Sequence, residues 1–126
     1  MGQSTPPTKQ AVLVVEDEPL LRMMAMDLVE DAGFQAVEAA DADEAVTILE
    51  TRTDIRIVFT DIDMPGSMNG MKLAAAVRDR WPPIEIIIVS GQVRLSEGDL
   101  PERSVFFSKP YDWQKVTATL RRMARH

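Results

Sequence analysis

Residues 84–89 have the sequence IEIIIV, which predicts a strand at the centre of a parallel sheet. A strand that is buried on both faces carries a nearly continuous apolar run, because neither face meets water. Similar short runs occur at 11–15 (AVLVV), 55–60 (IRIVFT) and 105–107 (VFF), and residues 34–38 form a weaker candidate. The chain therefore contains five candidate strands.

Helical patterns separate these strands. We predict helices from Pro19 to a stop at Gly33, after the cap Asp41, over residues 71–81, and after the cap Asp112. Five alternating β and α units with right-handed crossovers imply an α/β fold, in which a three-layer, doubly wound parallel sheet has helices on both faces.

The apolar residues of the first and last helices recur at helical spacing, and residues 91–104 are the least regular part of the chain. Gly98 and Pro101 interrupt that stretch, so any helix there should be short or irregular. The residues expected to form the apolar stripes are Leu21, Met24, Ala25 and Leu28 in the first, amphipathic helix, and Trp113, Val116, Leu120 and Met123 in the last. We expect the stripe of the last helix to face the core.

Polar residues follow four of the candidate strands: Glu16 and Asp17 the first, Asp61 the third, Ser90 the fourth and Lys109 the fifth. Ligand sites of open α/β sheets lie at the carboxyl ends of the strands. We therefore expect these side chains to share one crevice.

The chemistry of such a crevice favours phosphoryl transfer. Two carboxylates ~4 Å apart repel by about 4 kcal/mol at an effective dielectric of 20, so the site needs positive charge. Lys109 supplies one charge, and Mg²⁺ suits the remaining carboxylates. A carboxylate beside both can act as a nucleophile toward phosphorus, and the Ser90 hydroxyl can then bond a phosphoryl oxygen.

The length, net charge and residue composition of the chain exclude several classes of function. A chain of 126 residues supports one domain, and its net charge of −6 argues against direct DNA binding. The sequence has no cysteine and a single histidine, His126, so a metal should have oxygen ligands. Residues 1–10 read as a polar, flexible tail, and no stretch is long and apolar enough for a membrane span. We expect a cytoplasmic protein.

Taken together, the motifs VLVVEDEP, FTDIDMPG, IIIVSG and FFSKPYD resemble the receiver domain of two-component response regulators, of the stand-alone, CheY-like type. The resemblance covers about residue 10 to residue 126 and implies a receiver domain over 11–126. It also implies a flavodoxin-like sheet with strand order 2-1-3-4-5.

The resemblance assigns a role to each site residue, beginning with Asp61 as the phosphoacceptor. Phe106 and Asp63 are further positions that match the family. The implied roles are Mg²⁺ binding by Asp17, Asp61, the backbone carbonyl of Asp63 and, through water, Glu16; switching by Ser90 and Phe106; charge compensation by Lys109; tuning of dephosphorylation by Asp63 and Gln92; and a cis peptide bond at Lys109-Pro110.

The implied function is transfer of a phosphoryl group from a histidine kinase or phosphotransfer protein to Asp61, with signalling to an unknown protein target. In this family the domain catalyses only its own Mg²⁺-dependent phosphorylation and slow dephosphorylation, so it is not an enzyme acting on other substrates. The signal is read on the face of the fourth helix, fifth strand and fifth helix, which the irregular stretch 91–104 would alter.

Three alternatives stay open. The chain could be a receiver cut from a larger regulator or hybrid kinase, or a receiver fold that binds without being phosphorylated. A haloacid-dehalogenase-type phosphatase also uses an Asp-x-Asp pair, here Asp61 and Asp63, after an apolar strand. In that family, however, the Asp-x-Asp strand comes first, whereas here the acidic pair at Glu16 and Asp17 precedes it.

Overall fold

The computed structural model describes residues 10–64 and 69–124, apart from the side chain of Glu97. Three stretches lie outside this part: residues 1–9 of the predicted tail, residues 65–68 and residues 125–126. The elements are β1 (Ala11–Val15), α1 (Pro19–Asp31), β2 (Gln35–Ala39), α2 (Ala42–Thr51), β3 (Ile55–Asp61), α3 (Gly70–Arg80), β4 (Glu85–Ser90), the 3₁₀ helix η1 (Glu97–Asp99), β5 (Ser104–Ser108) and α4 (Trp113–Ala124).

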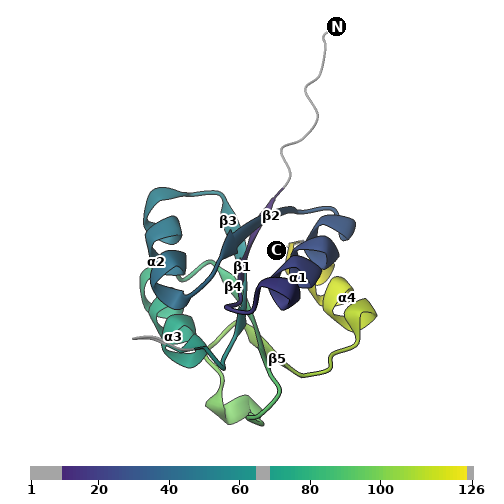
Figure 1. Ribbon diagram of the computed structural model, residues 1–126. Helices are drawn as coiled ribbons and strands as arrows, with labels where there is room; N and C mark the ends of the chain where they lie inside the picture. Colours follow the sequence, from purple (N-terminus) through teal and green to yellow (C-terminus); the bar gives the residue numbers. More distant parts are fainter. Residues whose placement is uncertain (1–9, 65–68, 125–126) are drawn as a thin grey trace, which may run out of the picture.

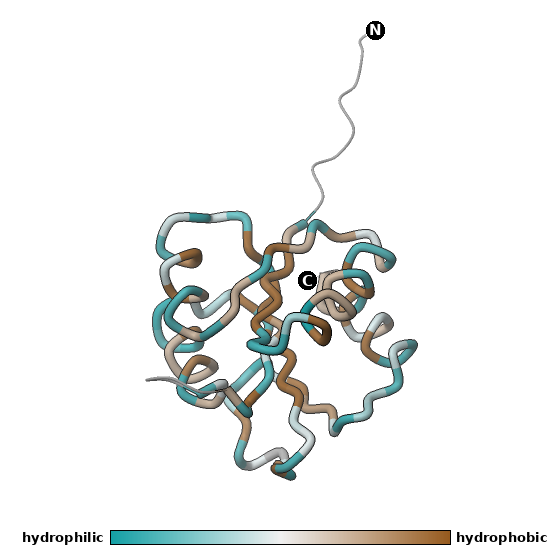
Figure 2. Tube along the Cα trace, viewed as in Figure 1, coloured by the Kyte–Doolittle hydropathy of each residue, from teal (hydrophilic) through white to brown (hydrophobic). Residues whose placement is uncertain are grey.

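The five strands form one parallel sheet in the order β2-β1-β3-β4-β5, as predicted. Helices α2 and α3 cover one face and α1 and α4 cover the other, so the fold has three layers (Figure 1). The central strands are the most apolar part of the chain (Figure 2). The doubly wound α/β prediction is therefore confirmed.

Each central strand packs side chains against both helical layers, which explains its continuous apolar sequence. In β4, Ile86 and Ile88 belong to the core under α2 and α3, whereas Ile87 and Val89 belong to the core under α1 and α4. All four side chains are at most 3% exposed. Successive residues of a strand point to opposite faces, so a strand covered on both sides needs apolar residues at every position.

Local sequence signals set the helix ends. Asp41 accepts a hydrogen bond from the Glu44 N–H at 2.8 Å, which caps α2. Asn69 caps α3 in the same way through the Lys72 N–H at 3.0 Å. Gly33 follows α1 with φ of 101°, a left-handed conformation that favours glycine.

The fourth αβ unit differs from the predicted alternation. Between β4 and β5 the described residues contain η1 and no α-helix, in line with the irregular stretch expected at 91–104. The five strands are therefore accompanied by four α-helices. Leu95 and Leu100 from this connection pack, partly buried, against the core under α2 and α3.

Arg78 of α3 holds the end of this connection. Its guanidinium donates to the backbone carbonyls of Glu102 at 2.7 Å, Pro82 at 2.6 Å and Ile84 at 3.0 Å, and to Arg103 at 3.4 Å. Burial lowers the pKa of Arg78 below its ordinary value, with the positive charge of Arg103 acting in the same direction. One side chain thus joins α3, the start of β4 and the entry to β5.

The expectation that Trp113 faces the core is wrong, and two residues of the first apolar stripe are exposed as well. Trp113 is 62% exposed, Met24 is 57% exposed and Leu21 is 42% exposed. Helix α1 instead buries Ala25 and Val29 against the sheet. Helical periodicity identified an apolar surface on both helices, but that surface is wider than the part that the sheet covers.

We expect Arg78→Ala to lower the free energy of unfolding by about 2 kcal/mol, because several backbone carbonyls lose a charged donor. Urea denaturation measures this change. Arg80→Ala is the matched control, since Arg80 makes an exposed ion pair with Glu50 and stacks on Trp81. Equal losses in the two variants would contradict the structural role of Arg78.

Candidate functional site

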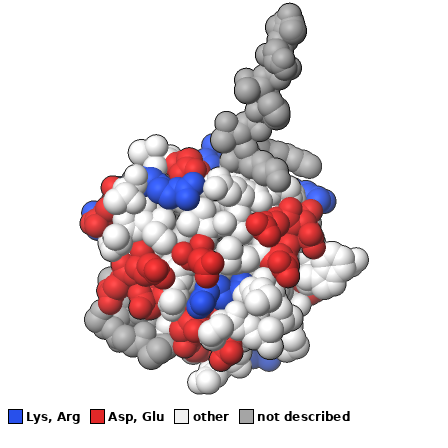
Figure 3. Space-filling view, turned by 45° about the horizontal axis from the view of Figure 1, so that its top comes forward, with Lys and Arg blue, Asp and Glu red and all other residues white. Residues whose placement is uncertain are grey.

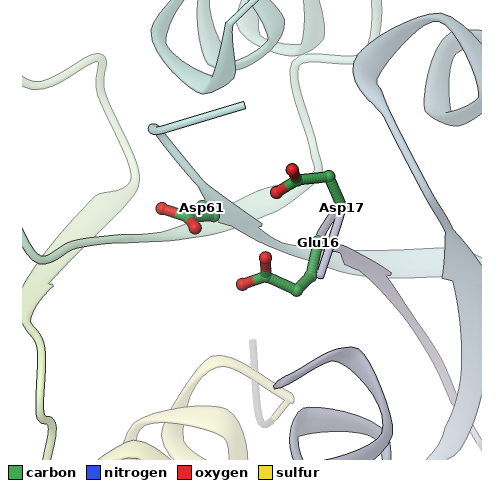
Figure 4. Close-up of side chains that lie close together, drawn as sticks. All are labelled: Glu16, Asp17 and Asp61. Atoms are coloured by element: carbon green, nitrogen blue, oxygen red, sulfur yellow. The ribbon is translucent and has the colours of Figure 1, made fainter. Parts of the chain in front are cut away.

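The carboxyl ends of β1, β3, β4 and β5 meet at one edge of the sheet, and the predicted polar residues lie along it. Figure 4 shows the carboxylates of Glu16, Asp17 and Asp61 turned toward a common space. One oxygen from each lies within 4.8 Å of the others. Acidic side chains also gather in several patches on the face drawn in Figure 3.

Glu16 is buried at the end of β1, at 6% exposure. Its Oε2 accepts a hydrogen bond from the Glu18 N–H at 3.1 Å, and its Oε1 lies 3.4 Å from Lys109 Nζ. Burial raises the pKa of the Glu16 carboxyl above its ordinary value, and the charge of Asp61 acts in the same direction. Ionisation of Glu16 therefore costs more free energy in the folded protein than in the unfolded chain.

Asp61 ends β3 and is 4% exposed. Its Oδ2 accepts a hydrogen bond from Lys109 Nζ at 2.8 Å, and its Oδ1 accepts one from the Asp63 N–H at 3.1 Å. Burial alone would lower the pKa of Lys109, but the hydrogen bond and charge of Asp61, together with Glu16, raise it overall. Lys109 is thus a permanent cation beside the Asp61 carboxylate at neutral pH.

Gly70, the first residue of α3, allows the backbone after β3 to pass close to that helix. Its N–H donates to the Ile62 carbonyl at 3.2 Å. A Cβ at this position would overlap the Asp61 carbonyl oxygen and lie 2.7 Å from Ile62 Cα. Residue 70 must therefore be glycine for the backbone of Asp61 to take its observed position.

Ser90 ends β4, is 1% exposed and has all its hydrogen-bonding positions occupied. Its hydroxyl donates to Asp63 Oδ2 at 2.9 Å. The same oxygen accepts from the backbone N–H groups of Gln92 at 3.1 Å and Val93 at 2.9 Å. The sequence placed Ser90 at this edge but gave no sign of its bond to Asp63.

The other predicted positions lie around these residues. Phe106 in β5 is half-buried and packs against the core under α2 and α3, while Gln92 is exposed. The Lys109-Pro110 peptide bond is cis. Asp63 is half-buried next to Asp61 and Ser90.

A groove of about 880 Å³ between α1 and α4 reaches the site, and sequence reasoning missed it. Glu16, Asp61 and Lys109 lie among its lining residues, together with Tyr111, which packs edge-on against Phe59 at a ring-centroid distance of 5.9 Å. The exposed side chains of Leu21, Met24 and Trp113 also line it. The signal was present in the sequence as the two apolar stripes.

These features define a flavodoxin-like α/β domain with a lysine-paired acidic site at the carboxyl edge of its sheet. A sequence model of the response regulator receiver domain matches residues 12–121, and the chain belongs to this family. It is a receiver domain of two-component signal transduction. Receiver domains are signalling domains that interact with histidine kinases and phosphotransfer proteins.

Individual relatives agree with this assignment. The chain is 33% identical over 116 residues to the sensor kinase CckA of Brucella abortus (strain 2308), covering 89% of this chain and 12% of that protein. It superposes on a response regulator receiver protein from Pseudomonas putida with a TM-score of 0.81 and 28% identity, covering 93% and 99% of the two chains.

The fold is also that of the response regulator TrrA from Thermotoga maritima, whose structure is a complex with Mg²⁺ and BeF. The TM-score is 0.77 at 21% identity, with 90% of this chain and 98% of that chain covered. The chain spans only 12% to 37% of the length of the three curated relatives CckA, the glycerol metabolism activator and NtrX. In the described part of the chain, no helix has the length and apolar character of a membrane span.

We expect Gly70→Ala to lower the free energy of unfolding by about 2 kcal/mol or more, because the added methyl group overlaps backbone atoms that cannot move independently. Thermal or urea unfolding measures this. Gly98→Ala is the control, because a Cβ there meets nothing within 4 Å. Similar stability of the two variants would contradict the close approach at Gly70.

We expect Glu16→Gln to raise the free energy of unfolding at pH 7 in metal-free buffer. With a folded-state pKa above the ordinary 4.5, ionisation of Glu16 costs more in the folded than in the unfolded protein. This cost is absent below the unfolded pKa and develops as the pH rises through the folded pKa. The gain from Glu16→Gln should therefore shrink as the pH falls toward about 4.

Denaturant unfolding over that pH range tests this expectation. Glu30→Gln, on an exposed position of α1, is the matched control. A gain that does not depend on pH, or a loss of stability at pH 7, would contradict the electrostatic cost assigned to Glu16.

Proposed function

We propose that this chain accepts a phosphoryl group on Asp61 from the phosphohistidine of a histidine kinase or phosphotransfer protein. The observation that carries the proposal is the contact between Lys109 Nζ and Asp61 Oδ2 at 2.8 Å, within a cluster of two buried carboxylates and one half-buried carboxylate. An ammonium in this position forms an ion pair with the Asp61 carboxylate and lies where the transferred group would bring further negative charge.

The donor set fits Mg²⁺. Three carboxylates face one ammonium in the described site, so the cluster keeps an excess of negative charge that a hard divalent cation would offset. We assign the metal to Asp17, Asp61 and the backbone carbonyl of Asp63, with Glu16 acting through water. When bound, the metal would supply charge stabilisation to the transferred phosphoryl group.

In the proposed transfer, one Asp61 carboxylate oxygen attacks phosphorus in line with the phosphorus–nitrogen bond of the phosphohistidine. A phosphorus–oxygen bond forms, and the bond to the imidazole breaks, so the imidazole nitrogen keeps the electron pair. Lys109 pairs with the oxygens that gain charge, and Ser90 can donate to one of them once its hydrogen bond to Asp63 breaks. Later attack by water on phosphorus releases phosphate and restores Asp61, at a rate that Asp63 and Gln92 tune.

The groove between α1 and α4 supports the assignment of a protein donor. Exposed apolar side chains of Leu21, Met24 and Trp113 line a channel that continues to Asp61 and Lys109. Exposed apolar surface of this kind is typical of protein contact sites. We therefore place the donor along α1, with its phosphohistidine over Asp61.

The output is a protein contact, since the net charge of −6 disfavours a DNA backbone. The segment between β4 and β5, with Phe106 beside it, is the proposed site of the phosphorylation-dependent change. Action as a free-standing, cytoplasmic regulator or as part of a longer protein is compatible with the same chemistry.

Incubation with acetyl phosphate and Mg²⁺ should add the mass of one phosphoryl group to the chain. Asp61→Asn should abolish the addition, because an amide is a poor nucleophile, and chelation of Mg²⁺ should prevent it. Asp79→Asn, at an exposed position of α3, is the control and should be labelled normally. Intact-mass spectrometry measures the outcome.

Unchanged labelling in Asp61→Asn would place the acceptor elsewhere. Continuous turnover of free phosphate esters would instead favour the phosphatase alternative. Transfer from purified phosphorylated kinases would then identify the donor.

A further inference from the structure

The Ser90 hydroxyl is already engaged before any phosphoryl group is present. Its single proton is donated to Asp63 Oδ2 at 2.9 Å. Its oxygen accepts from the backbone N–H groups of Gln92 and Val93, which fixes the orientation of the hydroxyl. Since Ser90 is 1% exposed, water does not compete easily for this proton.

Asp63 connects this hydroxyl to the proposed acceptor. Its backbone N–H donates to Asp61 Oδ1 at 3.1 Å, while its carboxylate holds Ser90. None of the ion pairs within residues 10–64 and 69–124 involves Asp63. Among the described residues, the Ser90 hydroxyl donates a side-chain hydrogen bond to the Asp63 carboxylate.

From this geometry we propose that Asp63 is a positioning residue that competes with the phosphoryl group for the Ser90 hydroxyl. The inference rests on the proposed phosphorylation of Asp61. Both competitors are anions that need a donor, and Ser90 has one proton to give. Formation of the bond from Ser90 to a phosphoryl oxygen therefore requires the bond from Ser90 to Asp63 to break.

Once Asp61 is phosphorylated, electrostatic repulsion favours transfer of the Ser90 hydrogen bond from Asp63 to the phosphoryl group. The phosphoryl group adds roughly −1.5 to −2 charge beside the Asp63 carboxylate, so the two groups repel. Asp63 is half-buried and can turn toward solvent, where its carboxylate regains hydration. The Ser90 hydroxyl then donates to the phosphoryl oxygen in place of Asp63, so its proton stays in a hydrogen bond.

The change of hydrogen-bond partner at Ser90 also affects the connection between β4 and β5. The N–H groups of Gln92 and Val93 are bonded to the Ser90 oxygen, so rotation of the hydroxyl alters the anchor of the chain after β4. Val93 is 39% exposed, and its side chain lies where a partner can contact it. Release of Asp63 and movement of this segment are thus parts of one event.

The test measures the dissociation constant of beryllofluoride at saturating Mg²⁺ by titration calorimetry. The proteins are the full wild-type chain, Asp63→Ala, Ser90→Ala and the double variant, since alanine keeps the backbone carbonyl of residue 63. We expect Asp63→Ala to bind about tenfold more tightly than the wild type, the equivalent of one net hydrogen bond. In the Ser90→Ala background the same substitution should change affinity less than about twofold.

Two further variants separate competition from charge. Asp63→Asn keeps an acceptor oxygen but removes the charge, so its gain should be smaller than that of Asp63→Ala. Ser90→Thr keeps the hydroxyl and should preserve the coupling with Asp63. In the free protein, Asp63→Ala should also speed amide hydrogen exchange at Gln92 and Val93, because the hydroxyl is no longer held.

The outcomes separate this inference from the proposed function. Equal gains from Asp63→Ala in the Ser90 and Ser90→Ala backgrounds would indicate charge repulsion alone and would overturn the competition. No gain in either background would also overturn it. Absence of beryllofluoride binding by the wild type, or equal binding by Asp61→Asn, would overturn the proposed function and this inference with it.

Discussion

The contact of Lys109 with Asp61 and Glu16 is the constraint on which the site depends. The two buried carboxylates at neighbouring strand ends repel each other, and burial raises the pKa of the Glu16 carboxyl above its ordinary value. The ammonium of Lys109, 2.8 Å from one and 3.4 Å from the other, offsets part of that cost. Since β1, β3 and β5 carry these charges, the alignment of the strands and the electrostatics of the site are inseparable.

The sequence was sufficient for the sheet and for the residues at its carboxyl edge, because both follow from local rules. Buried strands must be apolar at every position, so 11–15, 55–60 and 84–89 were easily identified. Contacts between distant parts of the chain were not predictable in this way. Arg78 bonds to residues 24 and 25 positions away in the chain, and Ser90 to one 27 positions away. No local pattern encodes such pairings.

The errors on α1 and α4 have a related cause. Periodicity shows that Leu21, Met24 and Trp113 share an apolar surface, but not how far the sheet covers it. Small Ala25 and Val29 make the contact with the sheet, and the larger side chains remain exposed along the groove. Apolar residues beyond those needed for the core, such as Trp113, were therefore evidence for an exposed apolar surface rather than for the interior.

The connection between β4 and β5 is held mainly at its two ends, by Ser90 at the start and by Arg78 near residues 102–103. In the described part of this connection, Leu95 and Leu100 pack its middle against the core. Loop closure becomes costlier only slowly with length. Changes in the length and composition of this segment therefore have little effect on the stability of the sheet or on the position of Asp61. Domains with closely similar acidic sites at the sheet edge can in this way present different surfaces between β4 and β5.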